Sequence, residues 1–416
     1  MGAGTFVNES PYAEARPAST NPRRTVDLPL LVTVIALTVF GLIMMFSASW
    51  DYSLQQYGSA LYMFEHQIMW LGVGIVACFL LSYFDYHRLR TWIVPVMGLT
   101  IILLVAVLLV SEVRLGSRRG LYQGSYQPSE LAKLVSILYI SIWLYAKRQV
   151  LHDVSLGLIP LGVILGVIGG LIYQQPDISA AATVLMMGGL LFFLAGADLK
   201  QIIFMLAAAV VAGWLVVTVS PTGHERVAEF IAGLKDPTQA SYHIQRSFEA
   251  IVNGSWFGVG IGLAQSKLTG LPVPPTDSIF AVIIEELGLV GAVFLVGLYA
   301  LLVWRGFAIA RRAPDMLGTL LATGLVCWIG LEASINMAVI VGLLPFAGNA
   351  LPFVSAGGSN LVATLSAIGI IMNISRQRGE AVNEDEWRSY SASVDLRGWN
   401  RRRRISRPRR TPHREE

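Results

Sequence analysis

Charged side chains interrupt an apolar stretch of the sequence at residues 127–133, where Glu130 and Lys133 stand three residues apart. This spacing places both on one face of a helix. Charges are costly inside a bilayer, so two interpretations stay open: an ion pair that lets the helix enter lipid, or a charged wall facing a cavity. Arg118 and Arg119 precede the segment and are candidates to bind a diphosphate, because a guanidinium group matches phosphate oxygens.

Acidic residues also mark the starts of two further apolar runs. Asp177 follows Gln175 and Pro176, and Asp277 follows the proline-rich residues 272–275. Each is suited to the N-cap position of the helix that follows. Inside the second run, residues 285 and 286 are both glutamate, and at least one should face the protein interior because carboxylates rarely face lipid.

Small and polar residues cluster between 342 and 360, and this segment includes Ser355, Gly357, Gly358 and Ser359. One interpretation is irregular backbone at the edge of a cavity. The other is close packing of small residues between helices.

The elements that must position these groups are membrane helices. The chain has 416 residues, of which 54% are hydrophobic and only 14% charged, whereas soluble domains carry about 25% charged residues. About 20 apolar residues cross a bilayer, and backbone in lipid must be helical. We therefore predict an all-α integral membrane fold with about ten transmembrane helices, at 28–49, 66–84, 92–111, 128–146, 154–173, 179–196, 201–220, 276–303, 316–344 and 351–374.

Basic residues beside alternate loops indicate that both termini are cytoplasmic. The chain then divides into a cytoplasmic tail (1–27), a transmembrane domain (28–375) with an external segment at 221–275, and a basic cytoplasmic tail (376–416). Apolar pieces at 230–234 and 248–252 are predicted to be short interfacial helices within the external segment. We expect the basic tail to lie near anionic lipid rather than to bind nucleic acid. Cys78 and Cys327 are too few for a disulfide framework or a zinc site and are predicted to be packing residues.

The motifs, in this order, resemble the SEDS family (shape, elongation, division and sporulation). The shared segments are SAS at 47–49, QPSELAK at 127–133, QPD at 175–177, FGVGIG at 257–262, TDSIFAVIIEELG at 276–288 and GLLPFAGNALPFVSAGGS at 342–359. The resemblance extends over residues 28–376 and is closer to the division branch FtsW than to the elongation branch RodA. The sequence departs from the family pattern at Val273-Pro274, Ile178-Ser179 and Ala356.

The resemblance implies a peptidoglycan glycosyltransferase that polymerises lipid II and releases undecaprenyl diphosphate, in septal wall synthesis during division. It places the essential aspartate on Asp277, where a carboxylate can accept the proton of a sugar 4-hydroxyl. The leaving diphosphate needs cationic or metal stabilisation, so a divalent cation such as Mg²⁺ is a candidate cofactor. The residues expected to meet substrate are Arg118, Arg119, Gln127, Ser129, Glu130, Lys133, Gln175, Asp177, Lys267, Glu286, Ser355, Gly357, Gly358 and Ser359.

The family also implies a multi-pass protein of the bacterial inner membrane, with a class B penicillin-binding protein and other division proteins as partners. A RodA-like elongation polymerase is one alternative, and a non-catalytic scaffold is another. The main rival is a lipid II flippase, which needs a site reachable from both membrane faces. Most of the unusual polar groups fall on the predicted external side, which favours polymerisation of substrate that has already crossed.

Overall fold

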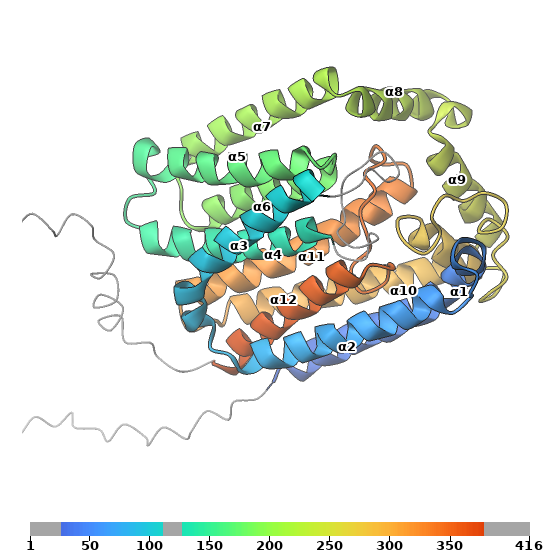
Figure 1. Cartoon of the computed structure of the whole chain (residues 1–416), viewed down its shortest axis with the longest axis horizontal. Coiled ribbons are helices and arrows are strands. Elements are labelled where there is room, and N and C mark those ends of the chain that lie inside the picture. Colours follow the sequence, from blue (N-terminus) through green and yellow to red (C-terminus); the bar gives the residue numbers. More distant parts are fainter. Residues whose placement is uncertain (1–25, 111–126, 378–416) are drawn as a thin grey trace, which may run out of the picture. The chain divides into compact units, whose positions relative to one another are not determined.

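The computed structural model describes residues 26–110 and 127–377, and every regular element in these ranges is a helix (Figure 1). The long helices are α1 (Leu28–Tyr57), α2 (Tyr62–Tyr83), α3 (Leu89–Val110), α4 (Pro128–Lys147), α5 (Ile159–Tyr173), α6 (Ile178–Leu194), α7 (Leu199–Val219), α10 (Ile279–Ala310), α11 (Met316–Ile340) and α12 (Gly358–Arg376). Two shorter ones, α8 (Pro221–Lys235) and α9 (Tyr242–Gly254), contain the two predicted interfacial pieces. The predicted all-α membrane architecture is confirmed.

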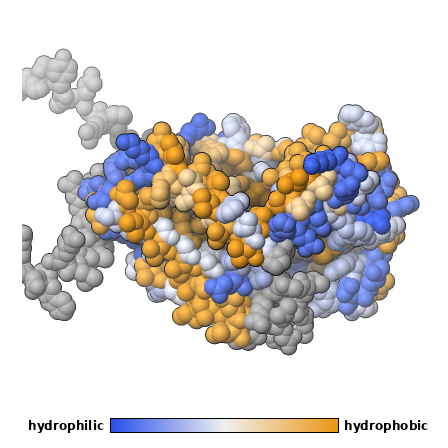
Figure 2. Space-filling model, turned by 90° about the horizontal axis from the view of Figure 1, so that it is seen from above, coloured by the Kyte–Doolittle hydropathy of each residue, from blue (hydrophilic) through white to orange (hydrophobic). Residues whose placement is uncertain are grey.

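Nine helical segments of the described residues are long and apolar enough to cross a membrane, and α6 is shorter, with 17 residues. Figure 2 shows apolar residues over much of the face it presents, with hydrophilic residues gathered toward the two ends. Helix α7 is the extreme case, because none of its apolar window is buried against protein. Such a surface is stable only when lipid covers it.

The structure differs from the sequence-based boundaries at the ends of α1 and α10, which run to Tyr57 and Ala310 rather than to 49 and 303, and between α11 and α12. We predicted helix to 344 and again from 351, but α11 ends at Ile340 and α12 begins only at Gly358. The intervening backbone contains Gly342 and Gly348 at φ of 74° and 65°. It also contains two prolines. A continuous helix is therefore interrupted both by the left-handed backbone at the glycines and by the missing N–H groups of the prolines.

The most buried helices are also those that carry charge. In the apolar windows of α4, α11 and α12, 78%, 72% and 89% of the residues are buried, against 11% for α2. Charged residues on α4 and α11 therefore face protein rather than lipid, as the cost of charge in hydrocarbon requires.

Contacts show which loops share an end of the helices. Arg305, near the end of α10, donates from Nη2 to Oδ2 of Asp27 at 2.6 Å, just before α1. The backbone N–H of Tyr86 donates to Asn373 Oδ1 at 3.1 Å, near the end of α12. The start of α1 and the end of α12 therefore lie at one end, while α8 and α9 lie at the other (Figure 1).

Candidate active site

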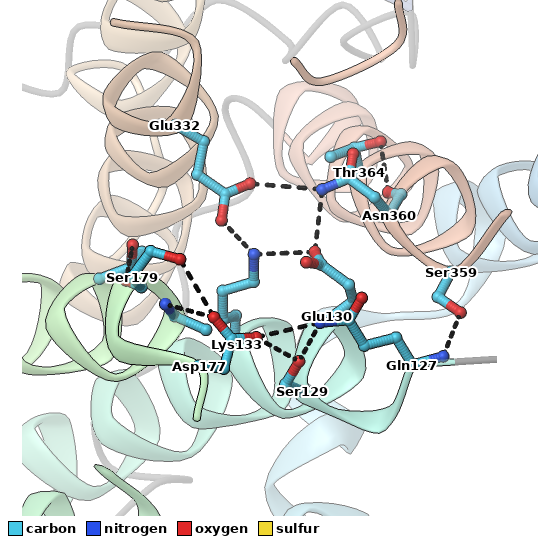
Figure 3. A network of polar contacts seen from close by, with 12 residues as sticks. Gln127, Ser129, Glu130, Lys133, Asp177, Ser179, Glu332, Ser359, Asn360 and Thr364 are labelled. Atoms are coloured by element: carbon cyan, nitrogen blue, oxygen red, sulfur yellow. Dashed lines mark hydrogen bonds and ion pairs between the residues drawn. The ribbon is translucent and has the colours of Figure 1, made fainter. Parts of the chain in front are cut away.

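Lys133 lies at the centre of a buried charged network that joins three helices (Figure 3). Its Nζ is 2.8 Å from Glu130 Oε2 and also contacts Glu332 Oε1 on α11. Asn360 of α12 donates from Nδ2 to Glu130 Oε2 at 2.8 Å and to Glu332 Oε2 at 3.4 Å. We call these four residues the Lys133 cluster.

The ion pair between Glu130 and Lys133 is confirmed, and the structure adds a second carboxylate to it. The side chain of Lys133 is only 5% exposed and that of Glu332 only 1%. Two carboxylates around one ammonium leave formal negative charge in excess. Glu332 was missed from the sequence, although a carboxylate within a predicted span is itself the signal that would have found it.

A second set of contacts joins the start of α4 to the starts of α6 and α12. Gln127 Nε2 donates to Asp177 Oδ2 at 3.0 Å, and Ser129 Oγ donates to the same oxygen at 3.2 Å. The backbone N–H of Gln127 donates to Ser359 Oγ at 2.9 Å. Asp177 Oδ1 accepts from the backbone N–H of Ala180, so its predicted N-cap role on α6 is confirmed. Four of the expected site residues thus lie together (Figure 3).

Asp277 lies just before α10 and does not cap it, contrary to the N-cap interpretation. The helix begins at Ile279 with Ser278 in the cap position. Ser278 Oγ donates to the backbone oxygen of Pro272 at 2.5 Å and lies 2.7 Å from Nε2 of His243 on α9. Burial lowers the pKa of His243 to about 4, so this ring is neutral at pH 7.

The segment 341–357 packs its backbone against Asp277. A Cβ atom built on Gly348, which has φ of 65°, would lie 3.3 Å from Asp277 Oδ2. Only glycine adopts that conformation without strain. Asn336 on α11 donates from Nδ2 to the backbone oxygens of Asp277 at 3.1 Å and Asn349 at 2.6 Å. The aspartate is therefore held between α10, α11 and this loop.

Ser355 fastens the loop to the residues before Asp277. Its Oγ donates to the backbone oxygen of Thr276 at 2.6 Å and accepts from the N–H of Leu351 at 2.7 Å. Gln67 on α2, which we did not anticipate, donates from Nε2 to Ser355 O and accepts from the N–H of Gly357.

Gly358 packs closely at the start of α12. A Cβ atom there would lie 2.3 Å from Cδ1 of Trp70 on α2, so a larger residue would displace that ring. Together with the irregular segment 341–357, this shows that both interpretations of the small-residue segment hold, each for a different part of it.

Lys267 and Glu286 form a separate buried pair, 3.2 Å apart, between α10 and the segment 255–271. Ser47 of α1 donates to both oxygens of Glu286, at 2.7 and 2.8 Å. We call Ser47, Lys267 and Glu286 the Lys267 cluster. Glu285 is also buried and accepts from the backbone N–H groups of Gln265 and Ser266, so both glutamates face the interior as predicted.

The remaining expected residues lie elsewhere. Gln175 is fully buried and donates to the backbone oxygen of Leu104 on α3. Arg118 and Arg119 lie outside the described residues. Within residues 26–110 and 127–377, no group of three or more His, Cys, Asp or Glu side chains is arranged to hold a metal ion. The carboxylates of Glu130 and Glu332 both contact the ammonium group of Lys133.

Comparison with known proteins places this geometry in a family. A family model for FtsW, RodA and SpoVE, described as "Cell cycle protein", matches residues 28–380. The chain belongs to this family. Stage V sporulation protein E of Bacillus subtilis (strain 168) is 33% identical over 363 residues, covering 86% of this chain and 99% of that protein. A "Probable peptidoglycan glycosyltransferase FtsW" of Trichlorobacter lovleyi is 37% identical over 356 residues, covering 84% and 93%.

Solved members of the FtsW/RodA/SpoVE family share the fold. The crystal structure of the rod shape determining protein RodA of Thermus thermophilus aligns with a TM-score of 0.63 and 26% identity, over 86% of this chain and 98% of that one. A chain from a structure of a peptidoglycan synthase complex, described as coordinating polymerization and crosslinking, aligns with a TM-score of 0.68 and 27% identity, over 86% and 99%.

Proposed function

We propose that this protein is a peptidoglycan glycosyltransferase that polymerises lipid II and releases undecaprenyl diphosphate, in septal wall synthesis. The observation that carries the proposal is the setting of Asp277. Its carboxylate faces a glycine-lined irregular loop, and its backbone is fixed by α11 one helical turn from the Lys133 cluster. Relatives that are 37% and 34% identical over most of this chain carry the name probable peptidoglycan glycosyltransferase FtsW.

In the proposed reaction, Asp277 accepts the proton of the sugar 4-hydroxyl as its oxygen attacks the anomeric carbon and the bond to the diphosphate breaks. A positioned general base typically contributes about 10²–10⁴-fold to rate. The contacts of Ser355 with Thr276 O and of Asn336 with Asp277 O hold the backbone that carries the carboxylate, which helps to position a base. We assign three side chains at the starts of α4 and α6 to bind the polar head of the substrate, namely Gln127, Ser129 and Asp177.

The Lys133 cluster fits the ion-pair interpretation better than a diphosphate contact. The ammonium of Lys133 already meets two carboxylates, so it is not free to meet a diphosphate. We therefore assign it to positioning α4, α11 and α12 around the substrate, and assign the diphosphate to arginines such as Arg118 and Arg119.

The proposed topology has ten crossings, cytoplasmic termini and an external segment from the end of α7 to Asp277, in the bacterial inner membrane. Two contacts support it. Asp27, just before α1, meets Arg305 near the end of α10, and His87 Nε2, just before α3, lies 3.2 Å from Asp315 Oδ2, just before α11. The loops that carry basic residues therefore lie at the end of the helix bundle where α1 begins. Helix α6 joins Asp177 at one end to the loop before α7 at the other, and 17 residues rise about 26 Å, close to the hydrocarbon thickness.

Polymerisation of lipid II by the purified protein tests the function, with and without a class B penicillin-binding protein, the proposed partner. We expect glycan strands from the native chain and a loss of at least 100-fold with Asp277→Ala, at unchanged expression and thermal midpoint. Full polymer yield from the folded variant would remove Asp277 from the mechanism. Transfer of lipid II across vesicles without polymer would instead support the flippase alternative.

A further inference from the structure

The side chain of Asn336 has an arrangement that its role as a loop clamp does not explain. Asn336 lies on α11, four residues after Glu332, and is 3% exposed. Its Nδ2 donates to the backbone oxygens of Asp277 and Asn349. It therefore stands between the proposed base and the Lys133 cluster.

These two contacts fix which way the amide points. An asparagine Nδ2 carries two protons, and here each meets a carbonyl oxygen. Turning the amide over would bring Oδ1 against the same two carbonyl oxygens at 3.1 and 2.6 Å. Since none of these oxygens carries a proton, that orientation is repulsive, and Oδ1 is assigned as the acceptor that points away from both carbonyl oxygens.

The acceptor Oδ1 of Asn336 is buried, and no donor within residues 26–110 and 127–377 hydrogen-bonds to it. Buried polar atoms in folded proteins are almost always paired, so this acceptor, on a side chain that contacts the backbone of Asp277, is available to a donor that comes with a ligand. The ligand must present an O–H or N–H group at this point.

We propose that Asn336 binds the saccharide of lipid II, with Oδ1 accepting a hydrogen bond from a sugar hydroxyl or acetamido N–H. This inference rests on the proposed function, and it deepens it by naming the group recognised. The 4-hydroxyl has one proton, and that proton points to Asp277 in the proposed reaction. The donor to Asn336 is therefore a neighbouring group of the same sugar.

The lipid and diphosphate parts of the substrate cannot supply this contact. A polyprenyl chain has no hydrogen-bond donor, and a diphosphate near neutral pH is predominantly an acceptor. Asn336 should therefore distinguish lipid II from undecaprenyl diphosphate. A clamp that only shaped the site would affect both ligands through the same distortion.

The experiment measures binding of lipid II and of undecaprenyl diphosphate to detergent-purified protein in the Asp277→Asn background, which prevents turnover. This substitution keeps the backbone oxygen that Asn336 contacts. Asn336→Ala is compared with Ser355→Ala, a matched control that loosens the same loop but removes no unpaired acceptor. Thermal midpoints report folding of each variant.

We expect Asn336→Ala to weaken lipid II binding about 5- to 10-fold more than it weakens undecaprenyl diphosphate binding, the worth of one hydrogen bond beyond any loss of the loop contacts. Ser355→Ala should change both affinities by a common factor. Equal changes of the two ligands in Asn336→Ala, or no change in either, would overturn the inference. Absence of polymerisation by the native chain would instead contradict the proposed function, so the two failures are distinguishable.

Discussion

Two lysines, Lys133 and Lys267, lie in the same half of the molecule with side chains that are each 5% exposed, and each pairs with a glutamate. Their surroundings differ. Lys267 meets one carboxylate and also donates to the backbone oxygens of Gly262 at 3.0 Å and Ser47 at 3.2 Å. Lys133 meets two carboxylates that come from different helices.

The Lys267 cluster holds a loop against a break in α10. Gly288 has φ of 67°, so the helix is interrupted there. The segment 255–260 supplies replacement hydrogen bonds: Gly260 N donates to Glu286 O at 3.0 Å, and Leu289 N donates to Ser255 O at 3.0 Å. Closely packed Gly258 permits this approach, because a Cβ there would lie 2.2 Å from the oxygen of Glu286.

The comparison teaches that a buried charge pair is not by itself a site. The Lys267 cluster balances one positive with one negative charge and fixes a loop. The Lys133 cluster carries excess carboxylate and is one helical turn from a residue that contacts Asp277. A cluster in that position joins the helices that hold Asp277, so its loss should disturb the proposed site as well as the fold.

The largest expected effect that tests this comparison comes from Lys133→Met. It leaves Glu130 and Glu332 buried without their cation, and removal of one partner from a buried pair typically costs about 3–5 kcal/mol. We expect a large fall in the thermal midpoint in detergent and loss of polymerisation. An unchanged midpoint would show that the two carboxylates do not depend on Lys133.

The sequence alone suggests a different test of this cluster, which the structure shows to be unsuitable. Exchanging Glu130 and Lys133 keeps their mutual attraction, but it also puts a carboxylate where Lys133 now meets Glu332. A purely structural cluster would fail that exchange too. The partner was not predictable from spacing, because Glu332 lies 199 residues from Lys133 in the chain.

The next effect concerns Lys267→Met, which leaves Glu286 with the hydrogen bond that the Ser47 hydroxyl shares between its two oxygens. We expect a smaller loss, about 2–3 kcal/mol, because a buried charge that keeps a hydrogen-bond donor is less costly. Adding Glu286→Leu should recover most of the thermal midpoint, since an apolar pair replaces an ion pair. The analogous Lys133→Met with Glu130→Leu should not recover, because Glu332 remains. Equal recovery in both pairs would erase the distinction between the clusters.

Much of the fold was predictable because each apolar run is local information. Each of the ten predicted runs coincides with a helix, but α1 and α10 extend past their predicted ends, and residues 341–357 are irregular where Gly and Pro interrupt an apolar pattern. Within the site, Glu130 with Lys133 was found from their spacing, and Asp177 from its cap position. Gln67, Asn336 and Asn360 were missed, because their partners are brought together only by tertiary packing.

A third prediction contrasts both clusters with the opposite end of the helices, where Asp315, just before α11, contacts Tyr86 and His87, just before α3. Burial pushes the pKa of Asp315 upward, but hydrogen bonds from His87, Gly318 N and Tyr86 outweigh it and leave the pKa lowered. Because the pKa of Asp315 is lower in the folded protein, its charge stabilises the fold at any pH above the unfolded pKa of about 3.9. This stabilisation is lost as the pH falls through the pKa of the folded state.

Asp315→Asn isolates that charge, because asparagine also caps α11. We expect a loss of about 1 kcal/mol at pH 7, seen as a lower thermal midpoint. The difference from the native chain should shrink as the pH is taken below about 4. A difference that is the same at pH 7 and at pH 3 would show that the carboxylate charge has no part in it.

The smallest effect is expected for an ion pair that looks strong by distance. Arg246 Nη1 lies 2.6 Å from Glu249 Oε2 on α9, closer than the 3.2 Å between Lys267 and Glu286. The α9 pair is exposed, with side chains 30% and 57% accessible, so water and salt compete with it. We expect Arg246→Ala to leave the thermal midpoint unchanged within error at low and at high salt. If Arg246→Ala lowered the midpoint as much as Lys267→Met, distance rather than burial would set the strength of these pairs. The contrast between the two buried lysines would then lose its physical basis, because that contrast depends on what each charge meets once water has been excluded.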